Sequence, residues 1–413
     1  MTYTVDELIK NAVKYPVRRV YFQFRDTDGN YTGTWVRMDN IDGVNRVIKH
    51  GKVTIKIDAD KVNINSYDIS TYSMQFMNQD GCFNSNADYR SCFFDYLDHK
   101  DTKIKIVVAL KDPDGVEVGT ITAFEGLIVD IDSKGDNTAP LKAVDYTKKL
   151  KEYPFSDLDL VGNKTITEIL TAIFADTRVA GFFSTTTLTP VQDVTIDIAT
   201  NDVFKKTMWD VIKFCAEKSQ STIFPFNETF YFGTREVIGT TPLFTFAGLG
   251  NLQNDRSITI YGKPSYDQSG ADKLYTSIID SSTNLIAQST DPILLDTGKT
   301  KTLDLSDVTT SAEKQDILDS YLSRWGQRRP ALKFKSPFMM FTLFPLDIIA
   351  VDSPGSKTEV NSGYYDSSIY DDGSVWDGDG SSASISGADR FVLESITYDV
   401  QKWETKVFCR KLI

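Results

Sequence analysis

The chain has 413 residues and a formal net charge of −12; 41% of its residues are hydrophobic, 25% are charged and 12% are aromatic. The length predicts two to four packed units, and the composition excludes a disordered protein and favours a β-rich one. The acidic balance argues against general nucleic-acid binding, which needs clustered Lys and Arg, and no apolar run approaches the ~20 residues of a membrane span.

Residues 1–150 are predicted to form an N-terminal helix and a first β-barrel-like domain. Thr4 and Glu7 have the spacing of a capping box, in which each side chain satisfies a backbone donor at the start of a short helix. Beyond Pro16 the apolar residues recur with period two, and turns such as Asp112–Gly115 separate the runs. Regular short strands of this kind favour a small antiparallel barrel or sandwich. The main predicted strands are residues 19–25, 34–38, 52–58, 69–77, 103–110 and 116–132.

Residues 151–240 are predicted to form an α+β domain of two helices and a hairpin. Thr165 and Glu168 make a second capping box, which an apolar stripe at helical spacing follows. Asp202 is expected to cap the next helix, because its short side chain can accept hydrogen bonds from the first backbone N–H groups. Two strands joined by a tight turn come next, Thr222–Phe226 and Thr229–Gly233.

Residues 241–330 are predicted to form a second α+β region that ends in a capped helix. Thr310 and Glu313 make the capping box of this helix, and Gly326 is expected to end it. The other elements expected here are a hairpin of residues 274–279 with 285–287 and a loop at residues 263–270.

Residues 331–413 are predicted to form C-terminal β-barrel-like strands with an acidic surface insertion at residues 361–387. The insertion is rich in Ser, Gly, Asp and Tyr, a composition that cannot bury a core and should form an exposed loop. The chain as a whole is therefore predicted to be α+β and β-rich. It would be multidomain, with two small antiparallel β-barrel-like domains and intervening helix-plus-hairpin α/β units.

Candidate partner contacts lie in this insertion and in one basic cluster. Aromatic side chains suit protein or sugar contact because they combine rigid apolar area with a polar edge; a flexible loop without a ligand is the alternative. Arg328 and Arg329 follow the predicted helix, whose C-terminal dipole favours cations, and pairing with acidic residues of a neighbouring subunit is the second interpretation. The aromatic residues of the insertion are Tyr364, Tyr365, Tyr370 and Trp376.

No pattern typical of an enzyme or a metal site occurs in the sequence. It has no GxSxG, HExxH or GxxxxGK[ST] motif, and neither His50 nor His99 stands at metal-ligand spacing from other ligand residues. We therefore predict no catalysis, no cofactor and no bound metal. Cys82 and Cys92 are expected to be reduced thiols in a cytoplasm, because the chain does not begin with a signal-peptide pattern; a disulfide between them is left open.

Three segments, read in chain order, resemble the tail-hub proteins of phage tails. The match covers most of the chain, but at Leu346 the chain departs from the Gly that hub relatives often have before Asp347. The matching parts are the Phe-Glu-Gly-Leu-Ile run at 124–128, the helix and aromatic strands of 208–232, and the C-terminal strands within 332–351 and 390–410.

The resemblance implies a structural virion protein of a phage tail tip or baseplate, assembled in the host cytoplasm. It is similar to the hubs of T-even baseplates, siphophage tail tips and type VI secretion spikes. Such hubs are homotrimers whose barrel-like domains form a pseudo-sixfold ring around the DNA channel and adapt the hexameric tail tube to a threefold tip or spike.

The partners implied by the resemblance are the tail tube or distal tail protein, the spike or tip protein and the tape measure protein. No membrane contact is expected, and DNA is expected only as passing cargo. The alternative function is a carbohydrate- or receptor-binding β protein that uses the Tyr/Trp-rich loop at 361–387.

Overall fold

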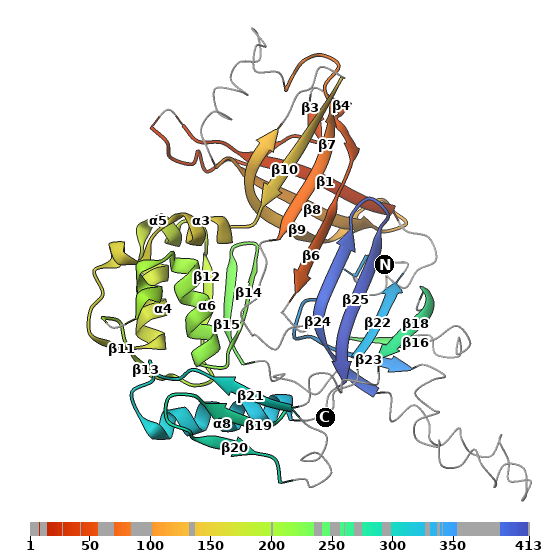
Figure 1. Cartoon of the computed structure of the whole chain (residues 1–413). Coiled ribbons are helices and arrows are strands. Elements are labelled where there is room, and N and C mark those ends of the chain that lie inside the picture. Colours follow the sequence, from red (N-terminus) through yellow and green to blue (C-terminus); the bar gives the residue numbers. More distant parts are fainter. Residues whose placement is uncertain are drawn as a thin grey trace, which may run out of the picture.

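The computed structural model shows two large sheets, a helical unit and a small α+β unit (Figure 1). The fold is α+β, β-rich and multidomain, as the sequence predicts. Of the predicted N-terminal helix, only Leu8 belongs to the described residues, and it is buried. The structure describes residues 8, 15–26, 28–41, 43–56, 70–83, 101–131, 137–199, 201–234, 242–247, 257–259, 261–267, 275–290, 299–326, 331–336, 339–340, 342–352 and 389–411.

Seven strands form the N-terminal sheet. They are β1 (Tyr15–Gln23), β2 (Val36–Arg37), β5 (Val47–Lys49), β7 (Thr71–Met77), β8 (Lys103–Lys111), β9 (Glu117–Ile131) and β10 (Thr138–Val144). The strand order is β2-β1-β8-β9-β10-β7-β5, with antiparallel pairing throughout. One face is buried because apolar residues alternate with polar ones: along β7, Tyr72, Met74 and Phe76 are buried, whereas Thr71 and Ser73 are exposed. A two-stranded ribbon of β3 (Asn40–Ile41) and β4 (Val44–Asn45) interrupts the chain between β2 and β5.

The helical unit contains the predicted capping box and hairpin. Glu168 N donates to Thr165 Oγ1 at 3.2 Å and Thr165 N donates to Glu168 Oε2 at 2.9 Å, which confirms the box. The helices are α3 (Thr147–Glu152), α4 (Ile166–Ala175), α5 (Thr177–Ala180) and α6 (Met208–Lys218), with 3₁₀ turns η1 (Phe155–Leu158) and η2 (Asp202–Lys205). The strands are β11 (Asn163–Thr165), β12 (Thr185–Leu188), β13 (Thr195–Asp197), β14 (Thr222–Phe226) and β15 (Thr229–Gly233), of which β14 and β15 are the predicted hairpin.

The expectation that Asp202 caps the next helix is wrong. Asn201 caps the short turn η2, with its side chain accepting from the backbone N–H of Val203, and the chain then becomes extended. Thr207 caps α6 instead, where its hydroxyl accepts from Asp210 N at 3.2 Å. Several adjacent residues here can act as caps, so the residue type alone could not fix where the long helix begins.

The small α+β unit shares its core with the helical unit. Buried residues of both units form one hydrophobic cluster, in which Ile278 and Leu318 join Trp209 and Ile212. The predicted hairpin and the capping box of Thr310 are confirmed. The elements are β19 (Tyr275–Asp280), β20 (Ile286–Gln288), β21 (Lys299–Leu303) and α8 (Ser311–Trp325).

The C-terminal sheet has eight strands, and it draws them from three distant parts of the chain. They are β6 (Lys52–Lys56), β16 (Phe244–Ala247), β17 (Ser257–Thr259), β18 (Tyr261–Asp267), β22 (Ala331–Ser336), β23 (Ile348–Asp352), β24 (Asp389–Asp399) and β25 (Glu404–Lys411). Most pairs are antiparallel, but β16 pairs in parallel with β17 and β23. The predicted domain boundaries at residues 150, 240 and 330 stay predictions.

The prediction of a loop at residues 263–270 is wrong for residues 263–267, because β18 continues to Asp267. This strand lies at the end of the sheet and pairs with β22 alone, with an irregularity between Tyr261 and Ser265. Pro264 sits inside that irregularity. An edge strand tolerates a proline, since one side of the strand needs no N–H donor, and the proline therefore concealed the strand in the sequence.

Candidate functional site

The partner contacts predicted from the sequence lie outside the described residues. This holds for Tyr364, Tyr365, Tyr370 and Trp376 of the insertion and for Arg328 and Arg329 after α8. Their roles stay predictions. Cys92, which is expected to be a reduced thiol, also lies outside the described residues. The structure instead draws attention to the place where the two large sheets meet, which no sequence pattern indicated.

One short segment joins the two sheets. β5 pairs with β7 in the N-terminal sheet, and two residues later β6 pairs with the second half of β24 in the C-terminal sheet (Figure 1). The register places Val53 opposite Tyr398, and both side chains are buried. Residues of both sheets belong to one hydrophobic cluster, so the sheets form a single packed body.

Arg18 of β1 also connects the two sheets. Its Nε donates to the carbonyl oxygen of Val400 at 2.6 Å, and a terminal nitrogen donates to the carbonyl oxygen of Gln401 at 3.3 Å. The guanidinium also lies 5.3 Å from the ring centre of Trp403, within cation–π distance. These contacts fix the turn between β24 and β25 against the N-terminal sheet.

His50 completes the connection. Its backbone N donates to Gln401 Oε1 at 2.8 Å, and its Nδ1 lies 3.0 Å from the Tyr72 hydroxyl. Burial, and the nearby charge of Arg18, lower the pKa of His50 to about 4. The imidazole is therefore neutral at neutral pH, and its role is to hold the connection by hydrogen bonds.

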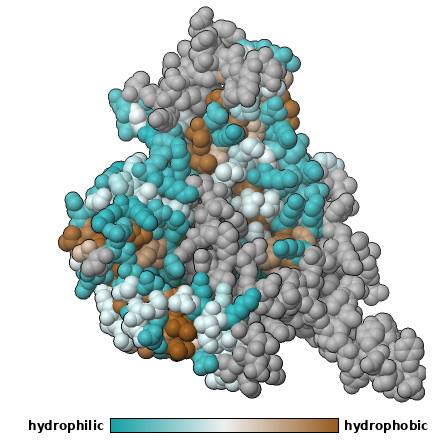
Figure 2. All heavy atoms as spheres, in the orientation of Figure 1, coloured by the Kyte–Doolittle hydropathy of each residue, from teal (hydrophilic) through white to brown (hydrophobic). Residues whose placement is uncertain are grey.

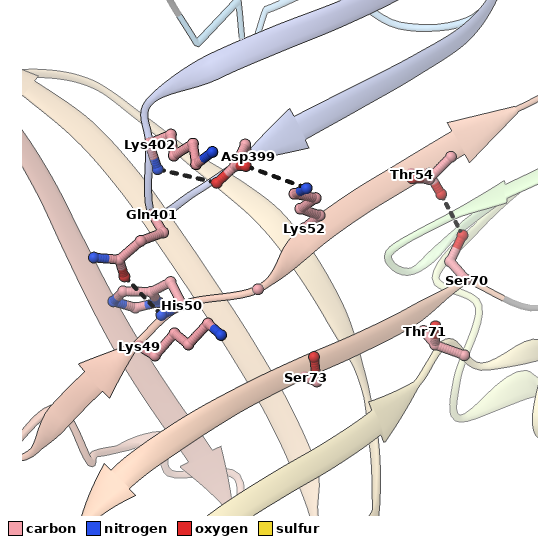
Figure 3. A pocket seen from close by; sticks show the side chains of 11 residues that line it. Lys49, His50, Lys52, Thr54, Ser70, Thr71, Ser73, Asp399, Gln401 and Lys402 are labelled. Atoms are coloured by element: carbon pink, nitrogen blue, oxygen red, sulfur yellow. Dashed lines mark hydrogen bonds and ion pairs between the residues drawn. The ribbon is translucent and has the colours of Figure 1, made fainter.

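A pocket of about 680 Å³ opens over this connection, and we call it the junction pocket (Figure 3). Residues from segments 49–54, 70–73 and 399–402 line it, so both sheets contribute. Asp399 has its Oδ2 3.5 Å from Lys52 Nζ, and its Oδ1 accepts from Lys402 N at 3.0 Å. Apart from Gly51, the residues that line the pocket are polar or charged, which suits a polar ligand.

Comparison with solved structures decides what this architecture is. The chain is similar to a tail protein from Neisseria meningitidis MC58, with a TM-score of 0.54, 12% identity, and coverage of 95% of this chain and 96% of that one. Prophage tail protein gp18 from Listeria monocytogenes EGD-e gives a TM-score of 0.51, 11% identity and coverage of 95% and 94%. The 43 kDa tail protein of prophage MuSo2 from Shewanella oneidensis gives 0.50, 9% identity and coverage of 95% and 97%. This chain has the fold of phage tail proteins. No family model and no curated protein matches its sequence.

Within this tail-protein fold, the Phe-Glu-Gly-Leu-Ile run lies at a second junction, between the N-terminal sheet and the helical unit. Phe124 stacks on Tyr72 in the core of the sheets, whereas Leu127 packs into the core of the helical unit. Gly126 is required because a Cβ there would lie 2.1 Å from the carbonyl oxygen of Val144. The strand β9 thus contributes to two hydrophobic cores.

Glu125 occupies the same junction of the tail-protein fold. It is 6% exposed, and its Oε1 accepts a hydrogen bond from the Tyr146 hydroxyl at 2.8 Å. Burial raises the pKa of Glu125 to about 7. Nearby, Lys103 Nζ donates to the Gly181 carbonyl oxygen at 3.2 Å, which ties β8 to the end of α5.

Lys103 also lies among aromatic rings. Its Nζ is 4.8 Å, 5.2 Å and 5.3 Å from the ring centres of Tyr31, Tyr146 and Phe182. Burial lowers the pKa of Lys103, and the rings and the carboxylate of Glu228, 3.8 Å away, compensate the buried charge. No sequence signal marked this lysine, because its partners come from four separate parts of the chain.

The turn at Leu346 has a left-handed backbone. Its φ is 75°, a region that favours glycine. Leu346 N donates to the Leu393 carbonyl oxygen at 2.9 Å, and Phe344 N donates to Asp347 Oδ2 at 2.6 Å. These bonds hold the turn before β23 although a leucine occupies the strained position.

In the part of the chain that the structure describes, no group of three or more His, Cys, Asp or Glu side chains is placed to hold a metal ion. The thiols of Cys215 and Cys409 are buried, and burial raises the pKa of each, which makes them inert. Among the same described residues, no helix is long and apolar enough to span a membrane.

Proposed function

We propose that this chain is a structural, non-enzymatic virion protein of a phage tail tip or baseplate. The observation that carries the proposal is the similarity to three tail proteins over at least 94% of both chains, which leaves no large region of either without a counterpart. Shared fold alone does not imply shared function. The proposal therefore also rests on the sequence segments that resemble tail-hub proteins, among them the Phe-Glu-Gly-Leu-Ile run at 124–128.

Within the tail, the chain would act as a homotrimeric hub that adapts a hexameric tail tube to a threefold tip or spike and surrounds the DNA channel. Each copy carries two large sheets fused through one core. Three copies would then present six sheets to a tube with sixfold symmetry. The direct β6–β24 pairing supports this, because a ring of alternating sheets must keep the two sheets of each copy in a fixed relation.

The N-terminal sheet offers apolar residues for contact with a neighbouring copy. Val36, Val44 and Ile48 are 42%, 44% and 49% exposed, and they belong to β2, β4 and β5 at the two edges of this sheet and the ribbon between them. Elsewhere the visible surface is mostly hydrophilic, with separate apolar spots (Figure 2). Tail tube or distal tail protein, spike or tip protein and tape measure protein would be the other partners.

The location is tested by labelling. Antibodies raised against the purified chain should bind the distal end of the tail in phage particles produced by cells that carry the gene. Particles labelled on the capsid, or tails left unlabelled although the chain is present in their protein profile, would contradict a tail-tip position. The carbohydrate- or receptor-binding alternative, which rests on the loop 361–387, predicts labelling at the same place but binding of glycans by the isolated chain.

A further inference from the structure

The junction pocket is basic, although the chain as a whole is acidic. Three lysines line it: Lys49 at the end of β5, Lys52 in β6, and Lys402 in the turn between β24 and β25 (Figure 3). All three are exposed, and Asp399 supplies the only carboxylate among the lining residues. The pocket therefore carries two net positive charges in a chain whose net charge is −12.

The carboxylate of Asp399 already has partners within the chain. Asp399 is 6% exposed; it pairs with Lys52 and accepts the backbone N–H of Lys402. No carboxylate of the described residues lies within ion-pair distance of Lys49 or of the Lys402 ammonium. Two ammonium groups from different sheets are thus available to a ligand at the two sides of one pocket.

The remaining polar groups of the pocket include several hydrogen-bond donors. The amide of Gln401 and the hydroxyls of Thr71 and Ser73 are exposed on its wall. A ligand that suits this wall carries several acceptor oxygens and negative charge. The pocket volume, about 680 Å³, accommodates several side chains and is far larger than one inorganic anion requires.

We propose that the junction pocket binds an acidic segment of a partner protein, with two or more of its carboxylates on Lys49 and Lys402. A lysine ammonium group binds a carboxylate as a point charge, and two such groups in one pocket suit a segment that carries several carboxylates. A nucleic-acid backbone would need a longer track of cations than these few residues provide.

A bound segment would touch both sheets at once, because Lys49 belongs to the N-terminal sheet and Lys402 to the turn of the C-terminal sheet. The affinity for the segment would thus depend on the relative position of the two sheets as well as on charge. This inference adds a binding site to the proposed hub and does not depend on trimer formation, since peptide binding is measured whatever the oligomeric state.

The test uses the full chain and a fluorescent ten-residue peptide of alternating Asp and Gly, followed by anisotropy at low salt. We expect saturable binding that weakens as salt is added, and at least about tenfold weaker binding for the double variant Lys49→Glu/Lys402→Glu. Lys151→Glu is the matched control, because Lys151 is an exposed lysine of α3 outside the pocket, and it should leave binding unchanged.

Absence of binding, or equal binding by the double variant and the control, would overturn the proposal. A labelled single-stranded DNA of ten nucleotides is run in parallel; tighter binding of this DNA through the same two lysines would assign the pocket to nucleic acid and also overturn it. Both lysines are exposed, so the double variant should unfold at the same denaturant concentration as the unchanged chain, which separates loss of binding from loss of fold.

Discussion

Gly51 packs directly against Ser73, and a Cβ at position 51 would lie 2.1 Å from the Ser73 carbonyl oxygen. The contact lies at the point where the chain leaves the N-terminal sheet and enters the C-terminal one. The carbonyl oxygen of Gly51 also accepts from Val400 N at 3.3 Å. A side chain at position 51 would therefore push the linking segment away from β7 and disturb the junction of the two sheets.

Gly51→Ala should lower the free energy of unfolding by about 1–3 kcal/mol, the usual cost of forcing extra atoms into a packed site. Gly181→Ala is the matched control, since Gly181 has an ordinary helical backbone and nothing within 4 Å of an added Cβ. Urea denaturation of both variants measures the difference. Equal stability of the two variants would show that the sheets do not meet at Gly51.

Two substitutions of Leu346 should change the stability of the chain in opposite directions. Because its φ is 75°, Leu346→Gly relieves roughly 1 kcal/mol of backbone strain, whereas a β-branched residue increases it. We expect Leu346→Gly to be neutral or stabilising and Leu346→Val to destabilise by about 1 kcal/mol or more. Thermal unfolding checks both. If apolar contact governed the site, valine would be the better replacement and the order would reverse.

Glu125 should make the chain less stable as the pH rises. Its pKa is about 7 in the folded chain and near 4.5 when exposed, so the folded state binds the extra proton between these values. The stability that this proton provides is present below pH 4.5 and is lost as the pH rises through 7. Glu125→Gln keeps an acceptor for Tyr146 and removes the charge, so it should be more stable at pH 8 by about 2–3 kcal/mol.

The difference between Glu125→Gln and the unchanged chain is measured by denaturant unfolding at pH 4.5, 6 and 8. It should grow with pH over this range. A difference that is constant with pH would mean that Glu125 is ionised throughout and is not buried at this junction.

His50, in contrast to Glu125, should make the chain less stable as the pH falls. Its pKa is lowered to about 4 in the folded chain from 6.5, so the unfolded state binds the proton first as the pH falls. The chain therefore loses stability as the pH falls from 6.5 to 4, by up to about 3 kcal/mol. His50→Gln removes this loss. Nuclear magnetic resonance of the His50 ring checks the cause directly, since a titration near pH 6.5 would contradict a buried, neutral imidazole.

The sequence predicted those elements whose determinants lie close together. The capping boxes at Thr165 and Thr310 and the hairpin over Asn227 each depend on a few neighbouring residues, and each is present in the structure. The alternating pattern likewise predicted the N-terminal strands. The strand at 261–267 was not predicted, because Pro264 interrupts its pattern although a proline is tolerated at the edge of a sheet.

The candidate site could not be predicted in the same way. β6 reads as an ordinary strand of the first domain, but its partner β24 lies more than 300 residues further along the chain. Nothing in the alternation of Val53 and Ile55 tells which sheet they join. The junction pocket therefore exists only after the two sheets have packed, and its lysines look like unremarkable surface residues in the sequence.

The proposed ring of three copies is tested most directly by the mass and shape of the purified protein, measured by light scattering with negative-stain imaging. We expect particles of three times the 46.4 kDa chain mass, seen end-on as rings with an open centre and six similar lobes. A monomeric mass at every concentration tested, together with images that show only compact particles and no rings, would contradict the proposal of a trimeric hub.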